Sequence, residues 1–149
     1  MNKDTFYMAA ALEEAEQAFA KGEIPIGAVI VKDGEIIGRG HNLKETEKDP
    51  TLHAEIVAIR DAARNLGTWR LTGTTIYVTI EPCPMCAGAL VQARIRRLVY
   101  GADDLKAGAV GSLWDIVRDP RLNHRLEVRR GVLENEAKEL VQKFFTRLR

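Results

Sequence analysis

Residues 74–86, Thr74-Thr75-Ile76-Tyr77-Val78-Thr79-Ile80-Glu81-Pro82-Cys83-Pro84-Met85-Cys86, carry the pattern that decides the fold. The first seven are mostly β-branched or aromatic, which is typical of a buried strand. That strand leads directly into Pro-Cys-x-x-Cys, and we expect a helix to continue from there to about residue 94. Cys83 and Cys86, at i and i+3, would then share one face of the helix. A helix N-terminus favours negative charge, so it would help both thiols to ionise and bind a metal.

A second segment, His53-Ala54-Glu55, supplies an imidazole and a carboxylate. His53, Cys83 and Cys86 are ligands that suit tetrahedral Zn²⁺, and three of them leave the fourth position open for water. A closed structural site would need a fourth protein ligand. The chain has only two cysteines, and His41 and His124 are not spaced as partners. We therefore predict one catalytic Zn²⁺ per subunit, with Glu55 as the catalytic residue that moves the protons of the activated water.

Each half of this pattern has a simpler interpretation. A lone Cys-x-x-Cys is compatible with a redox pair or two buried thiols, and a lone His-Ala-Glu with an ordinary helix start. Together, and with Pro82 before the first cysteine, they match the H-x-E and P-C-x-x-C signature of zinc nucleobase deaminases. Activated water could also attack amides or phosphates, but the H-E-x-x-H motif of zinc proteases is absent. Deamination fits: Glu55 would take the water proton and return it to the ring nitrogen and to the departing ammonia.

Composition predicts one globular domain spanning residues 1–149. The chain is 46% hydrophobic and 29% charged, and at this length it can bury a full core without disulfides. Two cysteines three positions apart cannot join distant segments, so we expect a reducing, cytoplasmic location. The short apolar run at Met8–Leu12 is followed at once by acidic residues, which argues against a signal peptide or a membrane partner.

The charge is unevenly distributed along the chain. Residues 1–60 hold 7 Lys and Arg against 11 Asp and Glu, whereas residues 118–149 hold 9 against 5. A polyanion would therefore meet the C-terminal part first. The alternative is that these cations are simply solvated.

Hydrophobic periodicity and turn residues predict an α/β protein. Asp4 is a candidate cap for the first helix, Thr51 is a candidate cap for the second, and Asp33-Gly34 is a strong hairpin turn. The nearly continuous apolar run at residues 24–31 suggests a strand covered on both faces. The order predicts a three-layer α/β/α fold with a five-stranded mixed sheet. The expected elements are helix 5–20, strands 24–31 and 35–40, helix 53–65, strand 74–80, helix 83–94, strand 97–102, helix 112–117, strand 126–132 and helix 134–148.

Beyond the two metal motifs, the chain resembles the bacterial tRNA-specific adenosine deaminases of the cytidine and deoxycytidylate deaminase superfamily along nearly its whole length. The metal motifs are shared with cytosine and guanine deaminases, so other stretches make the resemblance specific. These stretches are the Gly101–Ser112 loop, Asn123-His124-Arg125 and the Phe144-Phe145 tail, together with residues 22–29, 49–56 and 77–89.

The resemblance implies a cytidine-deaminase-like fold, a homodimer, and conversion of adenosine to inosine at the wobble position of a tRNA anticodon stem-loop. It also implies roles for residues outside the metal motifs. Asn42 would hydrogen-bond the flipped nucleoside, Ile26 would pack against the base, and the Ala54 backbone N–H would hold the base edge. Asp103, Asp104 and Lys106 would line the path of the flanking nucleotides, and Asn123, Phe145 and Arg149 would lie near the anticodon loop.

Several alternatives remain open at this point. Asn42 could be only a strand-end turn residue, Asp104 a loop cap, and Phe145 part of the core or of a dimer contact. A small-molecule base or nucleoside deaminase of guanine or cytosine type is the competing enzyme. A zinc-stabilised RNA-binding module is the competing non-enzyme, although such a module has no need of Glu55.

Overall fold

The structure, a computed structural model, describes residues 2–148. Five strands form one mixed sheet in the order β2-β1-β3-β4-β5, with β1 antiparallel to β2 and β3, and β3, β4 and β5 mutually parallel. This confirms the predicted mixed sheet. The elements are α1 Lys3–Ala20, β1 Gly27–Lys32, β2 Glu35–His41, α2 Ala54–Leu66, β3 Thr75–Ile80, α3 Pro84–Gln92, β4 Arg97–Ala102, β5 Glu127–Arg129 and α4 Glu134–Arg147.

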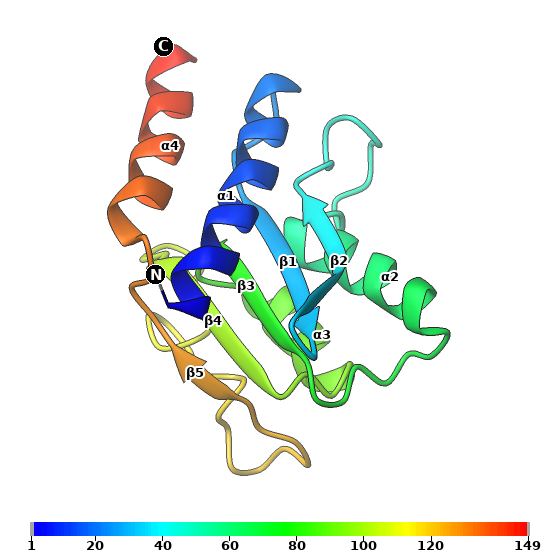
Figure 1. Ribbon diagram of the computed structural model, residues 1–149. Helices are drawn as coiled ribbons and strands as arrows, with labels where there is room; N and C mark the ends of the chain where they lie inside the picture. The colour runs from blue at the N-terminus through cyan, green and yellow to red at the C-terminus, as the bar shows by residue number, and fades with distance from the viewer. Residues whose placement is uncertain (1, 149) are drawn as a thin grey trace.

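Helices cover both faces of the sheet, as the three-layer prediction requires (Figure 1). On one face, Val29 and Tyr77 pack against α1, and α4 lies beside α1 over β3 and β4. On the other face, Ile30, Ile76 and Leu98 join the buried alanines of α2 and the apolar side of α3. Successive strand residues point to opposite faces, so β1 and β3 are buried on both sides. Within residues 2–148, no helix combines the length and apolarity needed to cross a membrane.

Two glycines in β2 allow α2 to lie very close to the sheet. A Cβ atom at Gly38 would come within 2.7 Å of Ala62 Cβ, and one at Gly40 within 2.5 Å of the Ala54 carbonyl oxygen. Glycine on the strand and alanine on the helix therefore bring the two backbones together. This close packing fixes where the N-terminus of α2, which carries the metal motif, meets the end of β2.

The helix boundaries differ from the sequence prediction at both candidate caps. Asn2 caps α1, because its side chain accepts a hydrogen bond of 2.9 Å from the Thr5 backbone N–H. Asp4 lies inside the helix and is buried against the sheet. Thr51 does not cap α2; its N–H and hydroxyl both donate to Asp49 in the preceding turn, and His53 occupies the N-cap position.

The predicted helix at residues 112–117 is wrong, and the predicted strand at residues 126–132 is shortened to β5. Residues 112–117 form turns and a short bridge between Val110 and Asp115. The carboxylate of Glu81 accepts hydrogen bonds from the backbone N–H groups of Val110 and Ser112. Gly111 also adopts a φ of +124°. These contacts hold the segment in a non-helical path.

Candidate active site

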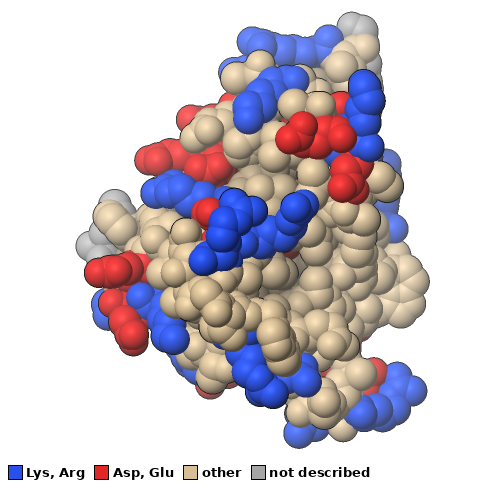
Figure 2. Space-filling view, turned by 90° about the vertical axis from the view of Figure 1, so that its right-hand side faces the viewer, with Lys and Arg blue, Asp and Glu red and all other residues tan. Residues whose placement is uncertain are grey.

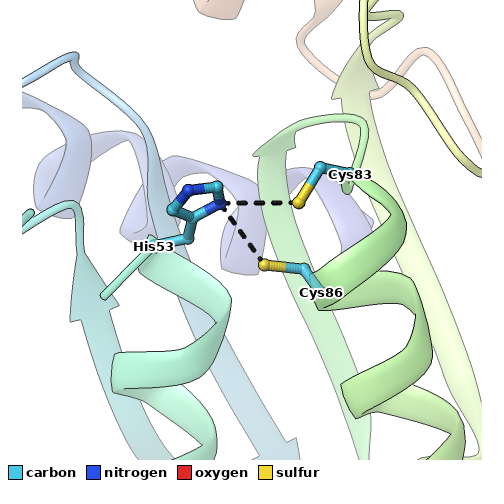
Figure 3. Close-up of side chains that lie close together, drawn as sticks. All are labelled: His53, Cys83 and Cys86. Carbon is cyan, nitrogen blue, oxygen red and sulfur yellow. Dashed lines mark hydrogen bonds between the residues drawn. The ribbon is translucent and has the colours of Figure 1, made fainter. Parts of the chain in front are cut away.

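His53, Cys83 and Cys86 converge from two different helices (Figure 3). The Nδ1 atom of His53 lies 3.6 Å from the sulfur of Cys83 and 3.6 Å from that of Cys86. The three ligand atoms lie within 4.8 Å of one another. With ordinary Zn–N and Zn–S bond lengths, a tetrahedral ion separates its nitrogen and sulfur ligands by roughly 3.6 Å. The donor set and its spacing therefore fit a zinc ion.

The fold places two of these ligands at helix N-termini, as predicted. His53 is the N-cap residue of α2 and Cys83 is the N-cap residue of α3, and both have extended backbone conformations. Neither side chain caps its own helix, so both remain free to face the shared site. Pro84 begins α3, where its missing N–H costs nothing. The positive ends of two helices thus point toward the pair of thiols.

The two thiols differ in their environment before any metal binds. Hydrogen bonds from Cys86 and His53 lower the pKa of the Cys83 thiol to about 4. The hydrogen bond to Cys83, together with burial, raises the pKa of Cys86. The contact with Cys83 also raises the pKa of His53. Cys83 and Cys86 thus share one proton, which binding of a divalent metal ion would displace.

Glu55 lies beside the ligands in a cavity of about 520 Å³. Its residue is 4% exposed, and burial raises the pKa of its carboxyl to about 7. A carboxyl group with a pKa near neutrality can both accept and return a proton. The lining side chains are Glu23, Ile24, Ile26, Asn42, Lys44, Glu45, His53, Glu55, Ile80, Glu81, Cys83, Asp104, Ala107, Phe144, Phe145 and Leu148, together with Gly22.

Four of the residues to which the resemblance gave substrate-binding roles line this cavity. Ile26 and Asn42 contribute from either side of the β1–β2 hairpin, and the Asn42 N–H donates to the Ile26 carbonyl at 3.2 Å. Asp104 reaches the cavity from the loop after β4, and Phe145 from α4. Phe145 is 44% exposed, whereas its neighbour Phe144 is buried against Phe19. These placements bring together residues up to about 120 positions apart, and their roles remain predictions.

Hydrogen bonds within the protein already engage three residues to which the resemblance gave substrate contacts: Asn42, Ala54 and Asp104. The Ala54 N–H donates to Asn42 Oδ1 at 2.9 Å, and Asn42 Nδ2 donates to the Ile24 carbonyl at 3.1 Å. Asp104 Oδ1 accepts from the N–H groups of Lys106 and Ala107, so Asp104 does cap its loop. These bonds give Asn42 and Asp104 a positioning role at the cavity wall.

Three of the remaining predicted residues, Asp103, Lys106 and Asn123, lie outside the cavity lining. Asp103 is paired with Arg130 in a separate hollow, and Lys106 is exposed on the same loop. Asn123 is exposed in the turn before β5. Arg149 lies outside the described residues. Asp103, Lys106 and Asn123 thus do not line the cavity that holds the metal ligands.

Several cations of the basic C-terminal segment are paired within the protein. Arg118 pairs with Asp115, Arg121 with Asp119, Arg129 with Asp4 and Arg130 with Asp103. Seen from the side of β2 and α2, Lys and Arg form several separate groups, and a broad area on the right carries neither sign of charge (Figure 2). The uneven charge of the sequence is therefore not one continuous basic surface on this face.

Sequence analysis missed two buried carboxylates in the cavity wall. Glu23 is 2% exposed and accepts hydrogen bonds from the N–H groups of Glu45 and Thr46 and from the Thr46 hydroxyl. Glu81 is 3% exposed and binds the loop after β4. A carboxylate placed directly between a buried strand and Pro-Cys was a usable signal for Glu81. Glu23 gave no such signal.

Comparison with known proteins identifies the family. Residues 1–149 match the MafB19-like deaminase family. The tRNA-specific adenosine deaminase of Bacillus subtilis strain 168 is 52% identical over 149 residues, which cover 100% of this chain and 92% of that protein. The chain belongs to the tRNA-specific adenosine deaminase family. A family member from Haemophilus influenzae is 50% identical over 98% of this chain and 85% of its own length.

Solved structures agree with the family and with the fold of this deaminase. A structure from a study of A-to-I editing by tRNA:A34 deaminases superposes with a TM-score of 0.88 and 48% identity, covering 91% of this chain and 99% of the other. The guanine deaminase of Bacillus subtilis superposes with a TM-score of 0.66 and 36% identity, covering 85% and 83%. The five-stranded fold is thus shared with deaminases of free bases, while the higher identity lies with the tRNA enzymes.

Proposed function

We propose that this protein converts adenosine to inosine, by hydrolysis, at the wobble position of a tRNA anticodon. The observation that carries the proposal is one cavity that joins the metal ligands and Glu55 to the Phe145 wall of α4, in a chain about half identical to tRNA-specific adenosine deaminases. Its volume, about 520 Å³, suits a single flipped nucleoside.

Nδ1 of His53 and the sulfurs of Cys83 and Cys86 would hold one Zn²⁺. When bound, zinc supplies Lewis-acid activation of water. Three protein ligands leave one position for that water, and the cavity gives it access to a substrate. We expect metal analysis to find about one zinc per chain.

Glu55 is the proposed acid–base residue. Its carboxylate accepts a proton as the water oxygen bonds to C6 of adenine, and it delivers that proton to the ring nitrogen N1. It then carries the second water proton to the departing amino group as the C6–N bond breaks, so that ammonia leaves. Burial in the cavity floor keeps its pKa near neutrality, where both transfers are efficient.

The cavity lining supports the proposed roles of the residues around the base. Ile26 offers an apolar surface to the adenine. Asn42 binds the Ala54 N–H and so positions the N-terminus of α2 beside the base. Phe145, nearly half exposed on α4, offers a ring on which a flanking base can stack. We keep Asp103, Lys106, Asn123 and Arg149 as contacts of the flanking anticodon-loop nucleotides, because the RNA extends well beyond a cavity that holds one nucleoside.

We propose in addition that the chain is a single domain that acts as a homodimer in the cytoplasm. The dimer is what the resemblance to tRNA-specific adenosine deaminases implies, and the broad area without charge in Figure 2 offers a surface for it. Exposed apolar side chains at Leu113 and Trp114, each about half exposed, are candidates for that contact. The tRNA substrate and the two free thiols favour the cytoplasm.

Parallel incubations test this proposal. Purified protein is given unfractionated tRNA, free adenosine and free guanine, and the products are separated by chromatography and mass spectrometry. We expect inosine from tRNA and little product from the free compounds. Xanthine from guanine, with tRNA unchanged, would instead support a small-molecule deaminase. That alternative is tested with guanine because the chain shares its fold with a guanine deaminase.

A further inference from the structure

Glu81 is a buried carboxylate to which neither the metal site nor the proton transfers assign a task. It follows β3 and precedes Pro82 and Cys83, and it is 3% exposed. Each of its oxygens accepts two hydrogen bonds. Oε1 accepts from the Asp104 N–H at 3.0 Å and from the Ser112 hydroxyl at 2.5 Å. Oε2 accepts from the N–H groups of Val110 at 2.9 Å and of Ser112 at 3.1 Å.

The loop around this carboxylate is shaped to receive it. A Cβ atom at Gly108 would come within 2.5 Å of Glu81 Oε1, so glycine leaves room for the carboxylate there. The Ala109 N–H donates to the Pro82 carbonyl at 2.8 Å, which ties the same loop to the residue before the metal ligand Cys83. Residues 104–112 are therefore wrapped around Glu81, while Ala109 and Val110 of the same loop pack into the hydrophobic core.

This loop forms one rim of the substrate cavity, because Asp104 and Ala107 both line it. We propose that Glu81 is a positioning residue that holds the rim formed by residues 104–112 for the RNA flanking the reacting nucleotide. The inference rests on the proposed function. Glu81 acts through the loop, since all four of its hydrogen bonds go to residues 104–112. It therefore sets substrate affinity rather than the proton transfers at Glu55.

The chemistry of the contact requires a carboxylate. Three N–H groups and one hydroxyl converge on two oxygens, and an ionised carboxylate offers only acceptors. A glutamine of the same size would turn its NH₂ group toward two of these donors and leave them unpaired. Glu81→Gln should thus loosen the loop of residues 104–112 without changing the size of the side chain at the cavity wall.

Steady-state kinetics on the zinc-loaded protein test the inference with a synthetic RNA stem-loop that carries adenosine at the wobble position. For Glu81→Gln we expect KM and the dissociation constant of the stem-loop to rise about tenfold while kcat changes less than about threefold. Zinc content should not change. Hydrogen exchange should speed up at the amides of residues 104, 110 and 112.

Two further variants separate this role from general stability. Asp4→Asn alters another buried carboxylate, which binds Tyr77, Arg97 and Arg129 at the opposite end of β3. It should lower the melting temperature and leave KM unchanged. Gly108→Ala attacks the same contact from the loop side and should reproduce the rise in KM, with little added effect in the Glu81→Gln background.

The outcomes are distinguishable from failure of the proposed function. If the wild type leaves tRNA and the stem-loop unreacted, the proposed deamination is wrong, and the stem-loop dissociation constants still decide the role of Glu81. Unchanged affinity in Glu81→Gln would overturn the inference. A proportional loss of kcat, zinc and melting temperature, with KM unchanged, would overturn it as well, because that result describes a merely structural carboxylate.

Discussion

The side-chain oxygen of Asn42 accepts a hydrogen bond of 2.9 Å from the backbone N–H of Ala54. Ala54 is the first residue of α2, so this bond joins the end of β2 to the helix that begins at the ligand His53. Asn42 also donates to the Ile24 carbonyl at 3.1 Å, in the segment before β1. One amide thus holds together three segments that meet at the cavity.

Asn42→Ala removes both of these bonds from a site that is 8% exposed. The free energy of unfolding should fall by about 1–3 kcal/mol, because the buried Ala54 N–H and the part-buried Ile24 carbonyl lose their partner. We expect kcat/KM on tRNA to fall at least about tenfold with zinc retained. Thermal unfolding, metal analysis and tRNA kinetics measure the three effects, and a kcat/KM within twofold of the wild type would contradict the assignment.

Glu55→Gln removes the proposed proton carrier and keeps the shape of the cavity floor. We expect kcat to fall by about 10²–10⁴-fold, the usual contribution of general acid–base catalysis. Zinc content and affinity for RNA should stay at the wild-type level. Glu47→Gln is the matched control, because Glu47 is exposed and lies outside the cavity lining. Substantial turnover by Glu55→Gln would mean that another group moves the protons.

The charge of Asp4, which is bonded to side chains of three strands, should make the stability of the fold depend on pH. The Arg97 guanidinium, with Tyr77 and Arg129, holds the pKa of this buried carboxyl well below its usual range. A lowered pKa stabilises the folded state above the unfolded pKa of about 4, and that stabilisation is lost as the pH falls further. We expect Asp4→Asn to lower the free energy of unfolding by about 1.5–3 kcal/mol at neutral pH, the range for hydrogen bonds to a charged group.

Denaturant unfolding at a series of pH values measures this difference. The difference in the free energy of unfolding between wild type and Asp4→Asn should become smaller as the pH falls below about 4. A gap that is independent of pH from neutrality to acid would show that the Asp4 contacts do not depend on its charge.

Lys44 is exposed, and its side chain lines the cavity. We expect Lys44→Gln to weaken RNA binding and to make the slope of log Kd against log salt shallower by about 0.7, the loss of one phosphate contact on single-stranded RNA. Lys48→Gln, in the same loop but outside the cavity lining, is the control. Equal salt slopes for wild type and Lys44→Gln would exclude a phosphate contact.

Local pattern was enough to predict most of the fold. The β-branched run before Pro-Cys predicted β3, and Arg97–Ala102 was predicted to the residue as β4. Gly67 ends α2 with a φ of +73°, two residues beyond the predicted end of that helix at residue 65. The metal triad was also predictable, because its chemistry is confined to two short motifs whose helices begin at the ligands.

The errors arose where distant residues decide local structure. Residues 112–117 have helical spacing, but Glu81, about thirty positions earlier, binds the N–H groups of Val110 and Ser112 where that segment begins. The Ile116 N–H donates to the Ala109 carbonyl instead of to a helical partner. Asp4 was predicted to cap the first helix, yet it lies inside α1 and its partners Arg97 and Arg129 come from β4 and β5. Hydrogen bonds of such separation leave no periodic signal, so the partners of Asp4 and Glu81 became visible only in the fold.

The most direct test of the central claim is deamination of unmodified tRNA in water enriched in ¹⁸O, followed by nuclease digestion and mass spectrometry of the anticodon fragment. The account predicts inosine at the wobble position with one ¹⁸O atom at C6, produced by the wild type and not by Glu55→Gln. Unmodified adenosine at the wobble position, or inosine that carries no label from water, would contradict it.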